Sequence, residues 1–545
     1  MKPDYVDNLR SMLIKSNLSV CLCECLRKIW RHERKVKSDM AENFEDTIAA
    51  ISTAMAPSGI GIVRISGKNA FAIADRVYSG KKGKRLSDQK QYTIHYGYIS
   101  DNGKKIDEVL VLVMREPHSY TGENTVEIDC HGGVLATRRV LEAVIHAGAR
   151  PADPGEFTKR AFLNGRMDLS QAEAVMDIIS AKNDYALRSA QQQLSGSISE
   201  KIETVRQKLL YETAHIEAAL DDPEHISLEG YGPELRRIVE EQRTEIRKLL
   251  LSADSGKLIQ EGIKTVILGK PNAGKSSLLN LLLGEERAIV TDIAGTTRDV
   301  LEEQINVRGI TLRILDTAGI RNASDKIEQI GVNRAIDQAR DADLILYVVD
   351  RSVPLDQNDY EIMKLIQNKR TIIVLNKSDL DSEVTEDMLK EELANHSELT
   401  PTAAHPGLTS GVEHSGGQHE TMTDSAGLHE HVSNSAGISD TVILNLSAKE
   451  KEGLEGLEKQ IEKMFFNGKI EFNDQIYVTN ARHKKALEDA ENSLDYVIKS
   501  IDDQMPEDFW SIDLMGAIDA LGRITGESLG EDLVNEIFAK FCMGK

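Results

Sequence analysis

The hydrophobic pattern of the first folded segment mixes strands with helices. From Thr47 to about Gly165, short runs rich in β-branched and aliphatic residues alternate with stretches of helical spacing, and the clearest runs are Ile60–Ile65 and Val109–Val113. Runs of this length and composition predict strands, and their alternation with helices is typical of an α+β domain. We expect one such domain over residues 46–165.

In the next segment, apolar residues recur every three or four positions, which predicts helices. The pattern begins near Ser170, where Ser170 and Glu173 have the spacing of a capping box, and it runs to about Leu220. More helix is expected to about Leu258. Helical spacing returns after about Asn480 and continues to the end of the chain.

Between these helical segments, the pattern changes at Gly262 to apolar strands that alternate with glycine loops and helices. This alternation predicts a mostly parallel α/β sheet. The expected strands are 265–268, 312–315, 344–349, 371–375 and 442–446. Because helices flank the α/β domain on both sides, we predict that it is inserted into one helical bundle domain; two separate helical domains are the alternative. The predicted boundaries are 166–260 and 469–545 for the helical domain and 261–468 for the inserted domain.

Two segments follow none of these patterns. Regular patterning begins only after Met40, so we predict that residues 1–45 form a disordered extension. Residues 396–440 are rich in Ser, Thr, Gly and His and poor in large apolar residues, which is typical of a low-complexity surface insertion. Cysteines 21, 23 and 25 and the histidines of the insertion are candidate metal ligands, but the spacing of a zinc site is absent from both segments.

Composition then limits the class of protein. The chain has 545 residues, five cysteines and a formal net charge of −22. The cysteines form no paired framework of the secreted kind, and the sequence has neither a signal peptide nor an apolar run long enough to span a bilayer. We therefore expect a cytoplasmic protein of several domains. Because the chain is strongly acidic and each phosphate contact needs a cation, we expect any contact with RNA to be confined to a small basic part of the surface.

A phosphate-binding loop follows the first strand of the α/β domain. Gly269–Ser276 satisfies the pattern G-x-x-x-x-G-K-[ST] and lies between a strand and an amphipathic helix. In this motif, backbone N–H groups wrap the phosphates at a helix N-terminus, Lys275 adds a cation, and the Ser276 hydroxyl is placed to hold Mg²⁺. The motif predicts a nucleotide site without saying which nucleotide.

Three further motifs follow later strands in the order of a guanine-nucleotide site. Asp316–Gly319 is suited to the Mg²⁺ shell and to sensing the γ-phosphate. Asn376–Asp379 has the pattern N-K-x-D, and the Asp379 carboxylate can accept both N1–H and N2–H of guanine, a pair that adenine lacks. Ser447–Lys449 is expected to complete the base pocket through its backbone. The sequence here resembles the translation-factor-like GTPases, which implies GTP as the ligand.

Two details concern the hydrolysis step. Ile320 follows Asp316–Gly319, where Ras-like enzymes have a glutamine that orients the attacking water. We predict that Glu328 positions the water instead, although an ordinary solvated helix carboxylate is the alternative. No arginine finger is identifiable, so a monovalent cation is a candidate for the charge between the β- and γ-phosphates. Asn272 offers that cation a neutral oxygen, and the segment 288–299 is placed to fold over it.

This asparagine and segment look like those of the potassium-activated GTPases. The resemblance implies that Ser276 and Thr297 bind Mg²⁺, while Lys275 and Glu328 are the residues that we predict to be catalytic. It implies that K⁺ is bound by Asn272, Thr291, Ile293 and Thr296. The GTP-binding residues that it implies are Asn272, Ala273, Gly274, Lys275, Ser276, Ser277, Thr291, Asp292, Ile293, Ala294, Gly295, Thr296, Thr297, Asp316, Thr317, Ala318, Gly319, Asn376, Lys377, Asp379, Ser447, Ala448 and Lys449.

The flanking parts narrow the family further. The end of the chain, Phe541–Lys545, resembles the Cys-x-Gly-Lys terminus of the MnmE (TrmE) family of tRNA-modification GTPases. The segments Val126–Gly133, Pro154–Asn164 and Asp168–Ala174 resemble other parts of that family. The resemblance covers the chain from Asp46 onward apart from the 396–440 insertion.

Membership of that family would imply a homodimer that acts with the FAD-dependent flavoprotein MnmG (GidA) in a heterotetramer. Together they would form the 5-carboxymethylaminomethyl or aminomethyl group on the wobble uridine of certain tRNAs. The one-carbon unit would come from 5-formyl- or methylene-tetrahydrofolate. The N-terminal domain would be folate-binding-like, with Arg64, Glu127, Arg166 and Lys545 at the folate site. A carboxylate suits the amino-pyrimidine edge of a pterin, and Arg and Lys suit the ligand's carboxylates.

Several alternatives remain open from sequence. Cys542 is either a reactive thiol or a small buried residue, and His131 is expected to shape a turn. A basic set is a candidate for tRNA phosphates or for a solvated surface; it consists of Arg138, Arg139, Arg150, Lys159 and Arg160. A GTPase switch in ribosome assembly, without a modification activity, is the main rival function. A folate-dependent transferase with a vestigial GTPase domain is the other.

Overall fold

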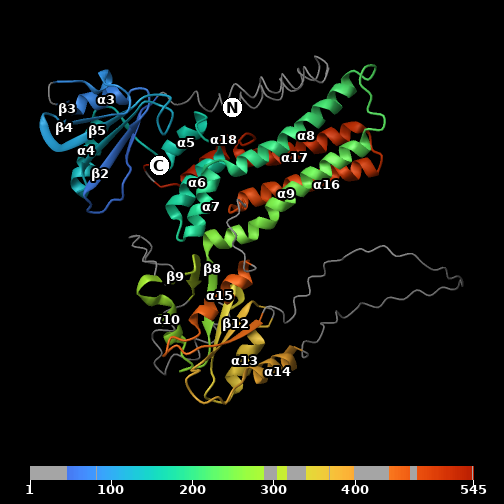
Figure 1. The fold of residues 1–545 in the computed structure, drawn as a ribbon. Helices are drawn as coiled ribbons and strands as arrows, with labels where there is room; N and C mark the ends of the chain where they lie inside the picture. Colours follow the sequence, from blue (N-terminus) through green and yellow to red (C-terminus); the bar gives the residue numbers. More distant parts are fainter. Residues whose placement is uncertain are drawn as a thin grey trace, which may run out of the picture. The chain divides into compact units, whose positions relative to one another are not determined.

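The computed structural model describes most of the chain as two compact units. The described residues are 46–80, 83–287, 303–315, 339–367, 369–397, 441–466, 476–542 and 544. The first unit joins residues 1–260 to residues 473–545, and the second comprises residues 261–472. Figure 1 labels the elements of each unit. Within the described parts of the chain, no helix is both long and apolar enough to cross a bilayer.

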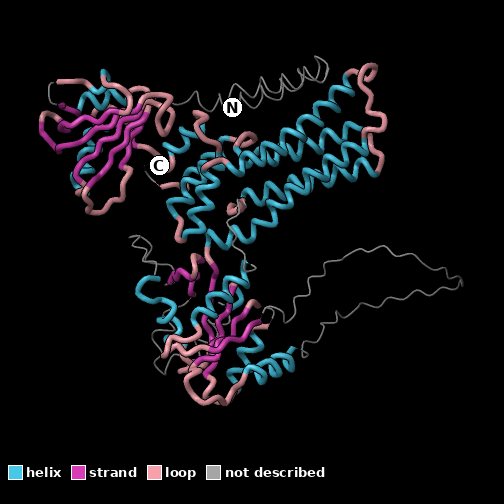
Figure 2. Tube along the Cα trace, in the orientation of Figure 1, coloured by secondary structure: helices cyan, strands magenta, loops and turns pink. Residues whose placement is uncertain are grey.

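The first unit begins with a seven-stranded sheet in the order β3-β4-β5-β6-β2-β1-β7 (Figure 2). Neighbouring strands are antiparallel except β1 and β7, which are parallel. The strands are β1 Ile48–Ile51, β2 Ile60–Ser66, β3 Tyr78–Gly80, β4 Thr93–Asp101, β5 Lys104–Met114, β6 Thr125–His131 and β7 Arg150–Pro151. The helices of this region are α3 Ala70–Val77, α4 Val134–His146 and α5 Glu156–Leu163, with a 3₁₀ turn at Leu86–Asp88. The predicted α+β fold is confirmed.

One face of this sheet is covered and the other carries exposed apolar side chains. Val63, Val111 and Ile128 lie on the covered face and share a core with residues of α3 and α4. Alternate positions along the same strands lie on the opposite face, because successive strand side chains point to opposite sides. The large apolar residues exposed there are Ile60, Ile94, Tyr96 and Leu110.

The helical part of the first unit comes from both sides of the inserted domain. Its helices are α6 Leu169–Ser180, α7 Asp184–Leu194, α8 Ser197–Asp221, α9 Gly232–Glu261, α16 Ala481–Asp502, α17 Glu507–Thr525 and α18 Glu531–Ala539. One hydrophobic core contains Leu209 of α8, Ile246 of α9, Leu494 of α16 and Leu521 of α17. The prediction of one helical domain made from two halves is confirmed.

The predicted capping box at Ser170 and Glu173 is wrong. Helix α6 begins two residues earlier, and its capping box is formed by Asp168 and Gln171, whose side chains bond to each other's backbone N–H groups. Glu173 instead pairs with Arg482 (2.6 Å) and His483 (2.8 Å) of α16. The helical region expected to about Leu220 consists of the three helices α6, α7 and α8.

The second unit is an α/β fold around a six-stranded sheet in the order β13-β12-β11-β8-β10-β9. All neighbouring strands are parallel except β9 and β10. The strands are β8 Ile263–Leu268, β9 Glu303–Val307, β10 Ile310–Ile314, β11 Leu344–Asp350, β12 Thr371–Asn376 and β13 Thr441–Asn445. The described helices are α10 Lys275–Arg287, α13 Gln357–Leu365, α14 Glu386–Ser397 and α15 Leu454–Phe466. The predicted parallel α/β domain is confirmed.

Candidate functional site

The phosphate-binding loop connects β8 to α10 and requires glycine at two positions. Gly269 has a φ of 148° and Gly274 a φ of 103°, both in the region that favours glycine. A Cβ atom at Gly269 would overlap the carbonyl of Val348 on β11, and one at Gly274 would overlap the side-chain amide of Asn376. The loop therefore lies directly against β11 and Asn376, and a side chain at either glycine would displace it.

Lys275 and the two serines after it occupy the first turn of α10. The Lys275 ammonium donates hydrogen bonds to the carbonyls of Gly269 and Lys270, each at 2.7 Å. Ser276 and Ser277 are exposed. A helix N-terminus with a lysine and exposed hydroxyl groups suits the phosphates and Mg²⁺ of a nucleotide.

Asn272 lies at the third position of a tight turn in this loop. The turn runs from Lys270 to Ala273 and is closed by a hydrogen bond from the Ala273 N–H to the Lys270 carbonyl at 3.3 Å. Pro271 takes the second position, and Asn272 has a φ of 62°. Proline followed by a residue of positive φ is typical of a type II turn, and asparagine tolerates that conformation better than most side chains. Asn272 is exposed, so its amide oxygen is available to a cation.

Asn376, the last residue of β12, connects the phosphate loop to the loop after β13. Its Nδ2 donates to the carbonyl of Ala273 at 2.8 Å, and its Oδ1 accepts from the N–H of Ala448 at 3.1 Å. Its side chain is buried. Since the carboxyl ends of parallel strands meet at one edge of a sheet, the loops after β8, β12 and β13 meet here. The structure thus brings three of the four predicted motifs together.

Two residues predicted for the base pocket, Asp379 and Ser447, lie in contact. The Ser447 hydroxyl donates to Asp379 Oδ1 at 2.6 Å, and this bond holds the pKa of the Asp379 carboxyl below its usual value, with Lys449 and Lys377 contributing. Asp379 is therefore an ionised acceptor at neutral pH. This is the state that guanine N1–H and N2–H require.

The sequence prediction missed the partner of Lys377. The Lys377 ammonium pairs with Asp350, the last residue of β11, and Lys377 has a φ of 63°. Burial raises the pKa of Asp350, but the bonds from Lys377 and Ser352 outweigh burial and lower it. Asp350 could have been predicted as this partner, because it is a carboxylate at the carboxyl end of a predicted parallel strand.

Several predicted residues lie outside the described residues, so their positions are not given. They are Thr291, Asp292, Ile293, Ala294, Gly295, Thr296, Thr297, Asp316, Thr317, Ala318, Gly319, Glu328 and Lys545. Across the residues that are described, no three His, Cys, Asp or Glu side chains are grouped to hold a metal ion.

A second predicted site lies on the sheet of the first unit. Arg64 of β2 and Glu127 of β6 are register partners, and Arg64 Nε lies 2.7 Å from Glu127 Oε1. The rings of Tyr120 and Phe157 lie 5.3 and 5.5 Å from the Arg64 guanidinium. Burial raises the pKa of Tyr120, and the positive charges of Arg64 and Arg166 act in the opposite direction. Tyr120 and Phe157 were not predicted, because single aromatic residues carry no sequence signal of a site.

The end of the chain reaches this sheet. The Gly544 carbonyl accepts hydrogen bonds from Ser52 (3.1 Å) and Arg64 (3.4 Å), and the Cys542 carbonyl accepts from the N–H of Gly155 (3.3 Å). Arg166 and Cys542 are exposed. Exposure excludes the interpretation of Cys542 as a small buried residue. The C-terminal segment therefore lies beside Arg64 and Glu127. The pairing of the strands alone would not have predicted this contact.

Comparison with known proteins covers both units. The model of the MnmE helical domain matches residues 169–542, and that of the GTP-binding protein TrmE N-terminus matches residues 47–166. The chain belongs to the MnmE family. The tRNA modification GTPase MnmE of Lachnoclostridium phytofermentans is 51% identical over 501 residues, which cover 92% of this chain and 99% of that protein. Its namesake from Clostridioides difficile is 44% identical, with 92% and 100% covered. The family predicted from the flanking motifs is confirmed.

Within this MnmE family member, the predicted basic set is already engaged by other side chains. Arg160 is fully buried and pairs with Asp46 (2.6 Å), Glu123 (3.2 Å) and Glu156 (2.9 Å), so its prediction as a contact to tRNA phosphates is wrong. Arg150 also pairs with Glu156, at 2.6 Å. The exposed members bond to nearby side chains: Arg138 and Arg139 to Glu142, and Lys159 to Asn535.

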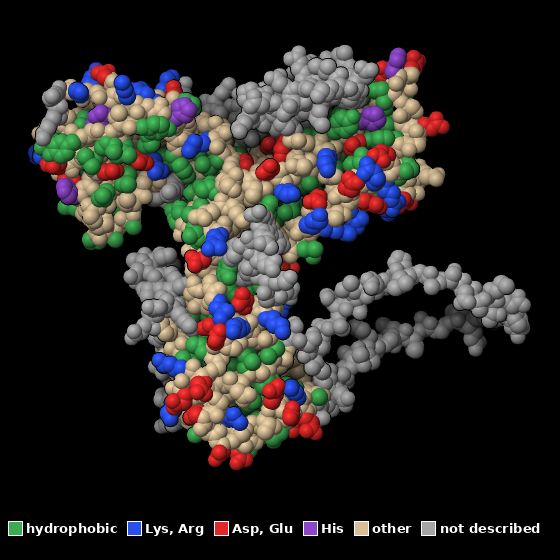
Figure 3. Space-filling model, in the orientation of Figure 1, with side chains coloured by type: hydrophobic (Ala, Val, Ile, Leu, Met, Phe, Trp, Pro, Cys, Tyr) green, Lys and Arg blue, Asp and Glu red, His purple; other side chains and the backbone are tan. Residues whose placement is uncertain are grey.

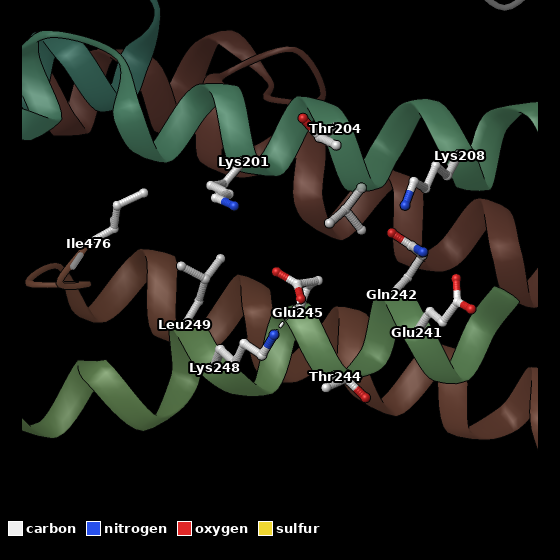
Figure 4. Close-up of a pocket in the computed structure, with 11 residues that line it drawn as sticks. Lys201, Thr204, Lys208, Glu241, Gln242, Thr244, Glu245, Lys248, Leu249 and Ile476 are labelled. Carbon is white, nitrogen blue, oxygen red and sulfur yellow. Dashed lines mark hydrogen bonds and ion pairs between the residues drawn. The ribbon is translucent and has the colours of Figure 1, made fainter. Parts of the chain in front are cut away.

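The helical domain also contains a groove between α8 and α9 (Figure 4). Lys201 and Lys208 of α8 line it opposite Glu241 and Glu245 of α9, and Lys248 lies 2.6 Å from Glu245. On the face in Figure 3, Lys and Arg side chains are interspersed with Asp and Glu. Mixed charges of this kind neutralise one another, and none of the residues predicted for GTP or folate lines the groove.

Proposed function

We propose that this chain hydrolyses GTP and, with the FAD-dependent flavoprotein MnmG (GidA), modifies the wobble uridine of certain tRNAs. The product would be the 5-carboxymethylaminomethyl or aminomethyl group. The observation that carries the proposal is the position of Asn376, which joins the phosphate loop to the base pocket in a chain of the MnmE family. This arrangement supports an intact GTP site, because a vestigial domain would have no need to keep it.

Several motifs of the GTPase domain would share the binding of GTP. Backbone N–H groups of the loop before α10 and the Lys275 ammonium would bind the phosphates, and the Ser276 hydroxyl would hold Mg²⁺ together with Thr297. The Asp379 carboxylate selects guanine, and Ser447 keeps that carboxylate ionised and oriented. Asp316–Gly319 would complete the contacts to Mg²⁺ and the γ-phosphate.

Hydrolysis needs a positive charge and a positioned water molecule. A bound K⁺ would supply positive charge between the β- and γ-phosphates, as an arginine finger does in other GTPases. Asn272 would hold it with Thr291, Ile293 and Thr296. The exposed amide of Asn272, presented by a turn that only a few residue types tolerate, supports this role. Glu328 would orient the water.

A folate site on the sheet would supply the carbon unit. Arg64, Glu127, Arg166 and Lys545 would hold 5-formyl- or methylene-tetrahydrofolate, which provides the one-carbon group when bound. The Glu127 carboxylate suits the amino-pyrimidine edge of a pterin. The guanidinium groups of Arg64 and Arg166 suit carboxylates of the ligand. The partly exposed ring of Tyr120 beside Arg64 supports the assignment, since a flat ring system stacks on such a neighbour.

The exposed face of the same sheet supports a homodimer. Ile60, Ile94, Tyr96 and Leu110 form an apolar surface on the face that also carries Arg64. Exposed apolar surfaces of this kind are typical of protein interfaces. We infer that two copies join through this face and that the dimer binds MnmG and tRNA.

Hydrolysis assays in two salts test this proposal. GTP turnover by the full chain with Mg²⁺ is expected to be much faster in K⁺ than in the same concentration of Na⁺. The reason is that the oxygen ligands around Asn272 would fit the larger ion. Equal turnover in the two salts would refute the cation mechanism, and no GTP turnover in either would refute the enzyme activity.

A further inference from the structure

Lys270, the second residue of the phosphate loop, is held by a buried carboxylate. Its ammonium lies 2.6 Å from Asp359 Oδ2 and 3.2 Å from Asp356 Oδ2. The Lys270 side chain is 13% exposed and that of Asp359 is 1% exposed. Burial lowers the pKa of Lys270, but the two carboxylates outweigh burial and raise it. This ion pair is largely shielded from solvent, unlike an ordinary surface ion pair.

Asp359 connects Lys270 to two elements of the domain. Its Oδ1 accepts a hydrogen bond from the Tyr347 hydroxyl at 2.8 Å, and its Oδ2 accepts one from the N–H of Asp356 at 3.0 Å. Tyr347 lies on β11 opposite Leu268, the last residue of β8. The carboxylate thus connects β11 and the start of α13 to the loop that follows β8.

The backbone of Lys270 begins the turn that presents Asn272. Its carbonyl accepts the turn-closing hydrogen bond from Ala273 and a second one, at 2.7 Å, from the Lys275 ammonium. The ion pair of the Lys270 side chain therefore fixes the first residue of the turn. Because the Lys270 carbonyl bonds to Ala273 and Lys275, this residue also fixes the positions of Asn272 and Lys275.

We propose that Lys270, held by Asp359 and Tyr347, is a positioning residue that fixes the phosphate loop for the nucleotide and for the monovalent cation at Asn272. The cation part rests on the proposed function. Losing the anchor would let the turn shift, so bound GDP would leave faster and more K⁺ would be needed for hydrolysis. Guanine selection would not change, because Asp379 lies on a different loop.

The test compares three variants of the full chain. Lys270→Met combined with Asp359→Asn removes both charges, which avoids leaving an unpaired buried carboxylate. Lys270→Arg keeps the ion pair. Lys390→Met is the matched control, because Lys390 is an exposed lysine on α14 that pairs with Glu386 at 2.7 Å. The measurements are the dissociation rate of a fluorescent GDP analogue, the K⁺ concentration for half-maximal GTP turnover, and the preference for GTP over xanthosine triphosphate.

For the double variant, we expect GDP release about fivefold faster and a K⁺ requirement about fivefold higher, the effect of losing one net charged contact. Its guanine preference is expected to stay unchanged, and Lys270→Arg and Lys390→Met are expected to match the parent. Parental GDP release in the double variant would overturn the proposal. So would a loss of guanine preference that accompanied faster release, since this would indicate general unfolding of the site.

Two further results keep the test decisive. If the double variant does not fold, Tyr347→Phe decides, because it removes one hydrogen bond to Asp359 and leaves a buried ring. Faster GDP release from Tyr347→Phe would support the proposal, and parental release would overturn it. If the parent turns over GTP equally in K⁺ and Na⁺, the proposed cation mechanism fails, and the rate of GDP release alone decides the role of Lys270.

Discussion

The side-chain amide of Asn376 donates a hydrogen bond of 2.8 Å to the carbonyl of Ala273, between two loops more than one hundred positions apart in sequence. The same amide accepts from Ala448 through its oxygen. A single side chain thus holds the phosphate loop and the end of the base pocket at a fixed separation. We propose that this separation suits one bound nucleotide and that the GTP site depends on Asn376.

Asn376→Ala is expected to weaken GDP binding severely. It would leave the Ala273 carbonyl and the Ala448 N–H without their partner, at a cost of about 2 kcal/mol or roughly thirtyfold in affinity. Titration with a fluorescent GDP analogue measures the loss. Asn492→Ala, at an exposed position of α16, is the control and is expected to bind GDP like the parent. Parental affinity in Asn376→Ala would contradict the bridging role.

Asp379→Asn is expected to change base selection from guanine to xanthine. An amide at this position can accept from N1–H and donate to the C2 carbonyl of xanthine, but it cannot accept two hydrogen bonds from guanine. Competition of GTP and xanthosine triphosphate for hydrolysis measures the preference. Asp381→Asn changes an exposed carboxylate two residues away and should leave the preference for GTP intact. A Asp379→Asn variant that still prefers GTP would show that another group reads the base.

Asp177 is predicted to make the first unit less stable as the pH rises from about 4 to 6. Burial, and secondarily Glu173, raise the pKa of Asp177 to about 6, while a hydrogen bond from Gln260 opposes the shift. The folded chain therefore holds this proton more tightly than the unfolded chain does. Stability that is present below the unfolded pKa is lost as the pH rises through the folded pKa.

Asp177→Asn should remove this loss. We expect its free energy of unfolding to exceed that of the parent by about 2 kcal/mol at pH 7.5 and by little at pH 4. Denaturant unfolding at the two pH values measures the difference. Asp503→Asn, an exposed carboxyl at the end of α16, is expected to show the same small difference at both. A gain for Asp177→Asn that is equal at both pH values would refute the titration account.

Gly544→Ala is expected to weaken folate binding. Gly544 has a φ of 83°, and a Cβ atom there would overlap the carbonyl of Ile51, so the substitution should release the C-terminal segment from Arg64 and Ser52. The strain suggests an affinity for 5-formyltetrahydrofolate lower by about tenfold, measured by calorimetry. Gly530→Ala is the control, because its φ is −73° and no atom lies within 4 Å of the added Cβ. Equal affinities in the two variants would argue against a role for the segment.

Sequence predicted the elements whose signals are local. The phosphate loop, the strands around it and the helix that begins after Asn480 all follow from glycines, caps and apolar spacing within a few residues. The start of α6 is an exception, because both Ser170 with Glu173 and Asp168 with Gln171 have the spacing of a capping box. In the structure, Glu173 pairs with Arg482 and His483 on a helix far along the chain, and Asp168 and Gln171 form the capping box.

The contacts that sequence could not predict join distant segments. The bridge made by Asn376, the anchor of Lys270 on Asp359 and the approach of Gly544 to the sheet each depend on the fold as a whole. The burial of Arg160 is a further case, because nothing in its immediate sequence distinguishes it from an exposed arginine. Pairing with Asp46, Glu123 and Glu156 becomes visible only when these residues are placed in space.

The central claim is that GTP hydrolysis by this chain serves the modification of tRNA. The most direct measurement is mass spectrometry of wobble-uridine nucleosides in total tRNA from a bacterium that lacks its own MnmE, carrying either this chain or its Lys275→Ala variant. We predict that the chain restores the 5-carboxymethylaminomethyl or aminomethyl nucleosides and that Lys275→Ala, which lacks the phosphate-binding cation, does not. An unmodified profile with the parent chain, or full restoration by the variant, would contradict the account.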